Sequence, residues 1–345
     1  MKVALVADAV EFAGAERYLE VLAEGLRDQG DRLLALLPDE GDASLAERLG
    51  RHAEITRIPG LRRLPGAAAV PRVRRALTLF QPDVVHLNLT DQGDGIASVL
   101  AAPRRRAVAT LHNVLPARAA ARERVSACLL RRPAAVLCVS APVGRYVERL
   151  GGRAVVIPNG LPTAIPHPTP RVVLGLPEDA VVVGGIGRLD PQKGWDVLAA
   201  AAEQLPGVRV VVIGDGPQRG ELAGTRLELP GGRPDAAELV GAFDILAMPS
   251  RFEAFGLVAL EAMQAGVPVV ASAVGGLADL VADSGVLVPL EDADRLAAAL
   301  RDLLADPARR HALGEAGRAR SRQFTPAVMV EQTRRVLARV AADAS

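Results

Sequence analysis

Two glutamates, Glu253 and Glu261, stand eight residues apart in the otherwise apolar stretch 249–276. An unpaired charge is costly to bury, so a polar partner should meet each carboxylate. Carboxylates accept hydrogen bonds, and the hydroxyl groups of a sugar or a ribose donate them. The pair therefore predicts a site for a carbohydrate-bearing ligand. The alternative is that Glu253 faces solvent in a loop and that Glu261 belongs to a structural ion pair.

A glycine-containing loop, Phe255-Gly256-Leu257, separates the two glutamates and leads into an expected helix. Gly256 would let a ligand approach the backbone closely. The amides of these three residues would open the helix, and unpaired amides at a helix start attract anions. We therefore expect an anionic group to bind beside the glutamates.

Basic residues follow an earlier apolar run. The chain contains 41 Lys and Arg residues, yet only Lys2 and Lys193 are lysines. Lys193 and Arg188 lie in the loop 187–194, after the run Val181–Ile186, where a parallel strand would end. Loops at the carboxyl ends of such strands bind phosphates well. We expect Arg188 and Lys193 to bind phosphate; the alternative is an exposed turn with incidental charges.

The first half of the chain offers weaker candidates. Gly14 stands where a helix should open, and could bring the backbone close to a phosphate or simply make the turn. His112 follows the run Ala107–Leu111 and could form a hydrogen bond with a sugar hydroxyl or with the acceptor. A structural role is the competing interpretation for His112, and it is the favoured one for His86.

The elements that must position these residues alternate between short apolar runs and helical patterns. Unalternated apolar runs are typical of strands that are covered on both faces of a parallel sheet. Helical periodicity between the strands completes two doubly wound α/β units. The expected strands are Val3–Ala7, Leu33–Leu37, Val84–Leu87, Ala107–Leu111, Val136–Val139, Val181–Ile186, Val208–Ile213, Ile245–Met248 and Val267–Ala271.

The domain boundary is marked by proline. The segment 158–170 contains five prolines, and proline removes backbone donors and fixes φ, so it reads as a linker. We expect an N-terminal Rossmann-like domain over 1–160 and a C-terminal one over 161–325. A final helix within 326–345 is expected to pack back on the N-terminal domain. Ligands of such sheets bind beyond the carboxyl ends of the strands, so we expect the site in a cleft between the domains.

Composition limits the function classes. Net charge is +1, but the segment 57–132 holds 14 basic and 4 acidic residues. This segment is interpreted as a set of solvated helix faces. The alternative is that its positive charge attracts an anionic acceptor or a membrane surface. Nucleic acid is not expected, because aromatic residues for stacking bases are missing. No apolar run is long enough to span a membrane, so we expect a protein that is soluble or at most sits on a membrane surface. The two cysteines favour a cytoplasmic location, with peripheral contact at the inner membrane face as the alternative. Cys128 and Cys138 read as reduced core residues.

Two patterns imitate cofactor sites. Gly214-Asp215-Gly216 with Gly220 resembles a dinucleotide-binding turn, but no acid follows the next strand at the required place. Asp292 and Asp294 imitate a metal-binding pair, but they precede the expected helix Arg295–Leu304, where acids cap free amides. We therefore expect neither a cofactor nor a metal ion.

In combination, these residues resemble glycosyltransferase family four, the retaining glycosyltransferases of group one with the GT-B fold. The resemblance covers nearly the whole chain and rests on motifs in a fixed order: Gly14-Ala15-Glu16, Thr110-Leu111-His112-Asn113, Pro158-Asn159-Gly160, Gly187-Arg188-Leu189 with Lys193-Gly194, Gly214-Asp215-Gly216-Pro217, the pair Glu253 and Glu261 around Phe255-Gly256-Leu257, and Gly275-Gly276. It implies two Rossmann-like doubly wound parallel-sheet domains that face a cleft. The family pattern has a glycine pair in the first loop, so only Gly14 carries over.

The resemblance implies roles that fit the physical expectations. Arg188 and Lys193 would hold the donor diphosphate and stabilise charge on the leaving group. The Phe255–Leu257 amides would contact donor sugar and phosphate, with Glu253 on a sugar hydroxyl and Glu261 on the ribose. His112 would orient the sugar and Gly14 would contact phosphate.

We therefore expect a metal-independent, retaining sugar transfer from a nucleotide-diphosphate sugar, with uridine diphosphate as the family's commonest carrier. The acceptor stays open and includes anionic or lipid-linked molecules. The alternatives are a catalytically silent subunit that binds sugar nucleotides and a dinucleotide oxidoreductase.

Overall fold

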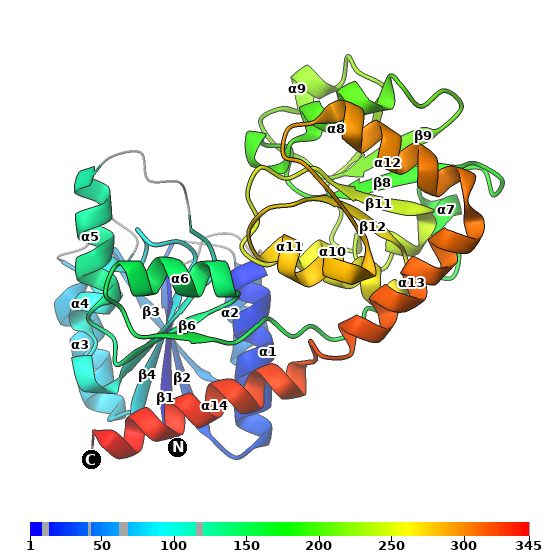
Figure 1. Ribbon diagram of the computed structural model, residues 1–345. Helices are drawn as coiled ribbons and strands as arrows, with labels where there is room; N and C mark the ends of the chain where they lie inside the picture. The colour runs from blue at the N-terminus through cyan, green and yellow to red at the C-terminus, as the bar shows by residue number, and fades with distance from the viewer. Residues whose placement is uncertain (9–13, 41–42, 62–67, 115–119, 345) are drawn as a thin grey trace. The chain divides into compact units, whose positions relative to one another are not determined.

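The computed structural model describes residues 1–8, 14–40, 43–61, 68–114 and 120–344, and it divides the chain into two units (Figure 1). Unit 1 comprises Met1–Gly160 and Thr325–Ser345, and unit 2 comprises Leu161–Phe324. Of the basic segment 57–132, Arg62, Arg63 and Arg118 lie outside the described residues.

Unit 1 is built on a seven-stranded parallel sheet with the strand order β3-β2-β1-β4-β5-β6-β7. Its inner strands are almost wholly apolar and buried, as a sheet covered on both faces requires. The strands are β1 Lys2–Ala7, β2 Arg32–Pro38, β3 Glu54–Ile58, β4 Val84–Leu89, β5 Ala107–Leu111, β6 Ala135–Cys138 and β7 Ala154–Val156.

Helices cover both faces of this sheet (Figure 1). They are α1 Gly14–Asp28, α2 Ala43–Gly50, α3 Val70–Phe80, α4 Ile96–Ala101, α5 Ala120–Leu130, α6 Ala141–Arg149 and α14 Pro326–Asp343, with a short 3-10 turn at Arg104–Arg106. Cys138 is buried in β6, where burial raises the pKa of its thiol to about 12, whereas Cys128 is exposed on α5. The expectation of a core Cys128 was wrong, because the solvent-facing side of α5 carries it, as it does Val125.

The last helix, α14, belongs to the core of unit 1. Met329, Val330 and Leu337 are buried in the same apolar cluster as β1 and α1. A Cβ atom on Gly25 of α1 would lie 2.7 Å from Val330 Cγ1, so the two helices pack closely only with glycine there. Arg334 of α14 also forms an ion pair with the buried Asp31, which follows α1, with Nε 2.8 Å from Oδ2.

Unit 2 repeats this plan with a six-stranded parallel sheet, in the order β10-β9-β8-β11-β12-β13. Its strands are β8 Val182–Ile186, β9 Arg209–Ile213, β10 Leu227–Gly231, β11 Ile245–Met248, β12 Val269–Ser272 and β13 Val286–Val288. Its helices are α7 Pro170–Val173, α8 Trp195–Ala202, α9 Arg219–Leu222, α10 Leu257–Ala265, α11 Gly275–Val281, α12 Ala293–Ala305 and α13 Pro307–Ser321.

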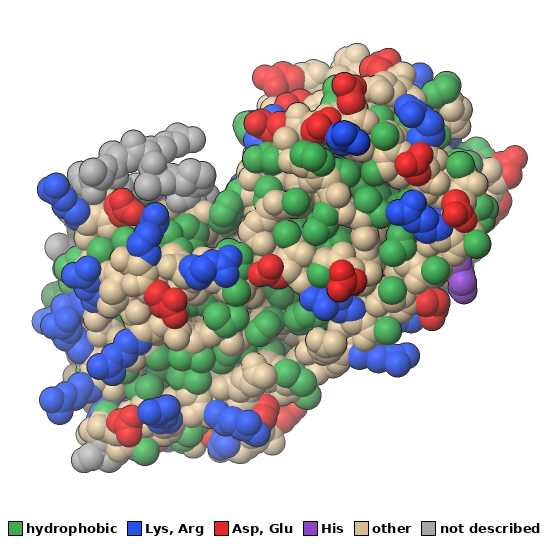
Figure 2. Space-filling model, in the orientation of Figure 1, with side chains coloured by type: hydrophobic (Ala, Val, Ile, Leu, Met, Phe, Trp, Pro, Cys, Tyr) green, Lys and Arg blue, Asp and Glu red, His purple; other side chains and the backbone are tan. Residues whose placement is uncertain are grey.

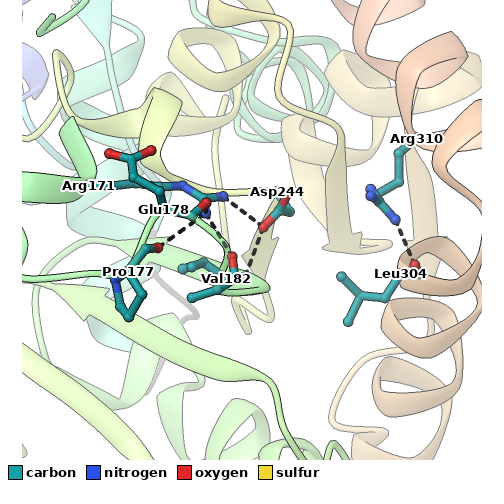
Figure 3. Close-up of polar contacts among 8 residues, drawn as sticks. Arg171, Pro177, Glu178, Val182, Asp244, Leu304 and Arg310 are labelled. Carbon is teal, nitrogen blue, oxygen red and sulfur yellow. Dashed lines mark hydrogen bonds and ion pairs between the residues drawn. The ribbon is translucent and has the colours of Figure 1, made fainter. Parts of the chain in front are cut away.

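Arginines hold the turns of unit 2 to its strands (Figure 3). Arg171 of α7 donates to the carbonyl of Glu178 at 2.6 Å and to Asp244 Oδ2 at 3.1 Å, and Asp244 also accepts from the amide of Val182 at the start of β8. Arg310 of α13 donates to the carbonyl of Leu304 at 2.7 Å, near the end of α12. Arginine supplies several donors from one planar group, which suits it to satisfying carbonyls at element ends.

Strand order reverses direction between β1 and β4 in unit 1 and between β8 and β11 in unit 2. In open α/β sheets, ligands bind beyond the carboxyl ends of the strands at such a switch point. The loops after β1, β4, β8 and β11 are therefore where a site should lie. Among the described residues, no helix is both long and apolar enough to cross a membrane.

Candidate functional site

At the switch point of unit 2, the loop after β8 carries Arg188. Its guanidinium binds Asp190, with Nε and Nη2 at 2.7 and 2.6 Å from Oδ2. The Arg188 side chain is still two-thirds exposed, and its carbonyl accepts from the indole nitrogen of buried Trp195 at 2.8 Å. The loop backbone is thus fixed to the start of α8 while the guanidinium stays accessible to an anion.

Lys193 and Glu253 form an ion pair across the switch point. Lys193 Nζ donates to Glu253 Oε1, and Ser250 Oγ, just past β11, donates to the same oxygen at 3.3 Å. Both charged side chains are largely buried. An ammonium has three donors, and Lys193 uses one of them on Glu253 Oε1. Glu253 Oε2 forms no hydrogen bond with any described residue. The ion pair therefore keeps two N–H donors of Lys193 and the acceptor Glu253 Oε2 for a ligand.

The helix α10 begins at Leu257, four residues after Glu253, and Gly256 is its N-cap. Gly256 has φ +100°, which favours glycine, and its position carries no side-chain cap. The first N–H groups of a helix have no intrahelical acceptor and carry partial positive charge. The amides of the Phe255–Leu257 loop stand at this helix start, two to four residues after Glu253 in the sequence. The ring of Phe255 is buried against Phe324, with centroids 5.6 Å apart.

Glu261 lies in the second turn of α10 and is 7% exposed. It is engaged by an interaction within the protein. Glu253 is similarly buried, at 8%, so the alternative that Glu253 is a solvent-facing loop residue was wrong.

Two glycines allow the loops around Glu253 to close tightly. A Cβ atom on Gly275 would lie 2.1 Å from the Glu253 carbonyl oxygen, which accepts from the amide of Gly276 at 3.0 Å. A Cβ atom on Gly194 would lie 2.2 Å from the carbonyl oxygen of Pro249. Neither loop could keep its place with a larger residue at these positions.

At the switch point of unit 1, His112 follows β5. Its Nε2 lies 2.8 Å from Asn88 Oδ1, and Asn88 Nδ2 donates to the carbonyl of Ala15 in the first turn of α1 at 3.2 Å. Since the Ala15 carbonyl only accepts, the amide orientation assigns the proton of His112 to Nε2 and leaves Nδ1 as an acceptor. Gly14 is the first residue of α1, beside this chain of hydrogen bonds.

A network of the polar side chains His86, Thr110 and Tyr18 contacts the ring of His112. The His86 ring lies 2.8 Å from Thr110 Oγ1, which also pairs with Tyr18 Oη at 3.1 Å, and the Tyr18 ring packs edge-on against His112. Burial lowers the pKa of His86 to about 3, and burial together with His86 lowers the pKa of His112 to about 3. Both imidazoles are therefore neutral near pH 7.

The two cofactor imitations have structural roles. Asp292 accepts from the amide of Arg295 at 2.8 Å and caps α12, as expected. Gly214 and Gly216 pack against the backbone of Gly187 and Leu189, where a Cβ atom on Gly214 would lie 1.9 Å from the Gly187 carbonyl oxygen. Across the described residues, no three His, Cys, Asp or Glu side chains come together as a metal site would require.

The sequence reasoning did not single out Asn88, Asp190 or Ser250. Asn88 and His86 are polar side chains alternating within an apolar strand, and such an interruption could have indicated a buried network. Asp190 and Ser250 stand within three residues of predicted site residues, but spacing alone does not show which way they point.

Two family models match the chain, one for Glycosyltransferase Family 4 over residues 12–165 and one for Glycosyl transferases group 1 over residues 168–320. The chain belongs to this family of glycosyltransferases, and its two parallel sheets form the GT-B fold.

Individual relatives agree with this assignment. The chain is 36% identical over 230 residues to the D-inositol 3-phosphate glycosyltransferase of Kineococcus radiotolerans, an alignment that covers 55% of this chain and 53% of the relative. Alignments with this and further D-inositol 3-phosphate glycosyltransferases cover between 32% and 53% of the length of those relatives. The structure of HepE from Anabaena in complex with UDP-glucose superposes with a TM-score of 0.84 at 27% identity, covering 98% of this chain and 99% of that one. Sucrose-phosphate synthase from Thermosynechococcus elongatus gives a TM-score of 0.84 at 25% identity over 100% of both chains.

Proposed function

We propose that this chain is a retaining glycosyltransferase that moves a sugar from a nucleotide-diphosphate sugar, with uridine diphosphate as the carrier, to a hydroxyl acceptor. The observation that carries the proposal is the buried ion pair of Lys193 with Glu253, which closely precedes in sequence the start of α10, where no side chain caps the helix. Cationic and amide donors next to a carboxylate suit a ligand that is anionic at one end and hydroxylated at the other. The likeness to HepE, solved with UDP-glucose, supports this choice.

In this proposal, Arg188, Lys193 and the amides of the Phe255–Leu257 loop bind the diphosphate. Positive groups fixed before reaction stabilise the charge that develops on the leaving phosphate, at no cost of reorganisation. Glu253 Oε2 accepts from a hydroxyl of the donor sugar, Glu261 from the ribose, and neutral His112 accepts through Nδ1. Gly14 contacts phosphate through its amide.

No nucleophile is assigned in the proposal, because both glutamates bind hydroxyl groups. The acceptor oxygen attacks the anomeric carbon from the face of the leaving group, the bond to the phosphate oxygen breaks, and that oxygen takes the acceptor's proton. Catalysis then consists of positioning and electrostatic stabilisation.

Thermal-shift and calorimetric titration with nucleoside diphosphates and their sugars tests the donor. Ligands that bind only the folded state raise the melting temperature, so UDP and a UDP-sugar should do so and other bases less. The absence of any shift would contradict the donor assignment. Binding without transfer or slow donor hydrolysis would instead favour a catalytically silent subunit.

Two further measurements test the mechanism. The anomeric configuration of the product, read by NMR, should match that of the donor, and inversion would exclude the proposed attack. Excess chelator should leave the rate unchanged, and a strict requirement for Mg²⁺ would contradict the metal-independent proposal.

A further inference from the structure

A second concave site lies in unit 1 at the opposite edge of its sheet from His112. It is a cavity of about 680 Å³ at the amino ends of β5, β6 and β7, beside the end of α14. His112 follows the carboxyl end of β5, whereas the cavity lies at the amino end. The length of the strand therefore separates the cavity from the candidate site. The cavity wall includes apolar residues, namely Pro133, Ala134, Ala135, Val155, Val336 and Val340.

Arginines dominate the polar part of this cavity. The arginines that line it are Arg104, Arg105, Arg131, Arg132, Arg153 and Arg339, and Asp343 is the acid among the lining residues that the structure describes. The first five make no ion pair with any residue in the described ranges, and Arg339 lies 3.9 Å from Asp343 with both side chains exposed. Six cations gathered with one described carboxylate repel one another, so an anion in the cavity would relieve that repulsion.

Two of these guanidiniums are held in place by backbone. Arg131 Nε donates to the carbonyl of Leu150 at 2.6 Å, and Arg132 Nε donates to the carbonyl of Val99 at 3.3 Å. A Cβ atom on Gly151, which has φ +80°, would lie 2.8 Å from Arg131 Nε, so glycine makes room for the arginine. The terminal nitrogens of both side chains are left without a hydrogen bond to a described residue, and are oriented before any ligand binds.

We propose that this cavity binds a phosphate-bearing anion. Guanidinium groups match the oxygen geometry of phosphate with paired hydrogen bonds, and the apolar wall would accommodate the carbon part of a phosphate ester. The phosphate could come from a soluble phosphate compound or from the headgroup of an anionic lipid. The basic character of the neighbouring surface, where blue side chains outnumber red ones over α3 and α5 (Figure 2), suits either source.

The test compares two pairs of substitutions that remove equal charge. Arg104→Gln/Arg105→Gln alters the cavity at exposed side chains that form no bond within the described chain. Arg27→Gln/Arg226→Gln is the matched control, at exposed positions outside the cavity and outside the basic surface over α3 and α5. Equal unfolding midpoints of both variants would show that the fold is intact.

The soluble source is tested by calorimetric titration of the full chain with pyrophosphate. Arg188→Gln/Lys193→Ala is included in every protein, so that the candidate donor site does not contribute. We expect the cavity substitutions to raise the dissociation constant for pyrophosphate by about tenfold or more, and the control substitutions to change it less than about twofold.

The lipid source is tested by flotation of the same proteins with phosphatidylglycerol vesicles and with phosphatidylcholine vesicles, at about 0.15 M salt. If only the variant with the cavity substitutions no longer floats with the anionic vesicles, a lipid phosphate is supported. If these substitutions weaken pyrophosphate binding but leave flotation unchanged, a soluble phosphate is supported. If the cavity pair matches the control pair in both experiments, the proposal is wrong.

Discussion

The side-chain amide of Asn88 connects the ring of His112 to the first turn of α1. It accepts from His112 Nε2 at 2.8 Å and donates to the carbonyl of Ala15 at 3.2 Å. One buried amide thereby fixes both the tautomer of the histidine and the distance between the ring and the helix that begins at Gly14.

Asn88→Ala should therefore lower kcat while leaving KM for the donor nearly unchanged. The His112 ring would lose its orientation, and a misplaced group costs roughly 10- to 100-fold in rate. Steady-state kinetics with varied donor would separate the two parameters. Asn88→Asp is the informative companion, because a carboxylate at this place raises the pKa of His112 and adds a protonated form near neutral pH. A rate and pH profile like those of the unaltered protein would contradict the positioning role.

Lys193→Ala should reduce kcat/KM by about 10²- to 10³-fold, the usual effect of losing one preorganised donor. Glu253→Gln should cause a comparable loss, because it removes both the ion pair and the negative charge of the carboxylate that accepts a hydrogen bond from the donor sugar. Since the two side chains touch, the double variant should lose less than the sum, by about 1–3 kcal/mol. Lys2→Ala, at the chain's other lysine, is the control and should leave the rate intact. Additive losses would show that the pair does not act together.

Gly275→Ala should weaken UDP binding, because the added Cβ atom would collide with the backbone of Glu253. Relief of that collision displaces the loop that carries the carboxylate, and strain of this kind costs about 1–3 kcal/mol. Gly207→Ala provides the matched control, since Gly207 also has positive φ, at +77°, but nothing within 4 Å. Calorimetric titration of both variants with UDP should show a loss for Gly275→Ala alone.

Acid should destabilise unit 1 through the imidazoles of His86 and His112, whose charged forms the fold disfavours. The folded-state pKa of His86 and that of His112 are about 3, below the ordinary value of 6.5, so the unfolded chain takes up protons first as the pH falls. The stability present above pH 6.5 is lost progressively between pH 6.5 and pH 3, by up to about 1.4 kcal/mol per pH unit for each histidine.

His86→Gln can retain a polar contact with Thr110 but cannot titrate, so it should flatten that dependence. Urea unfolding at about pH 7 and about pH 5 would measure the difference in unfolding free energy. His52→Gln, at a half-buried turn in the same unit, is the control and should keep the slope of the unaltered protein. An unchanged slope for His86→Gln would refute the assignment.

Each inner strand of the two sheets could be predicted from the sequence, and the strands that the sequence did not indicate share one property. They are β3, β7, β10 and β13, which are the edge strands of the two sheets. Edge strands are covered less completely, and Glu54–Ile58 and Leu227–Gly231 carry polar or exposed residues where an inner strand would be apolar. Their patterns therefore do not stand out from those of loops.

The candidate site was predictable in its members but not in their pairing. No partner for Glu253 is visible in the neighbouring sequence, and the structure supplies Lys193, which stands sixty residues earlier. Strand order brings the two together, because β8 and β11 are neighbours although β9 and β10 intervene in sequence. Local spacing cannot reveal such a neighbour, and the same is true of Asn88 and His112 on β4 and after β5.

The position of α14 in unit 1 has a consequence for the order of synthesis. Unit 2 is one continuous segment, whereas the core of unit 1 includes residues on both sides of it. On a ribosome, the first 160 residues must wait for the whole of unit 2 before Met329 and Leu337 can cover α1. At about 5–20 residues per second, this delay is about ten seconds or more. Nascent chains halted before Thr325 should thus be cleaved by protease within residues 1–160 but protected within 161–324, and equal protection would show that unit 1 closes without its last helix.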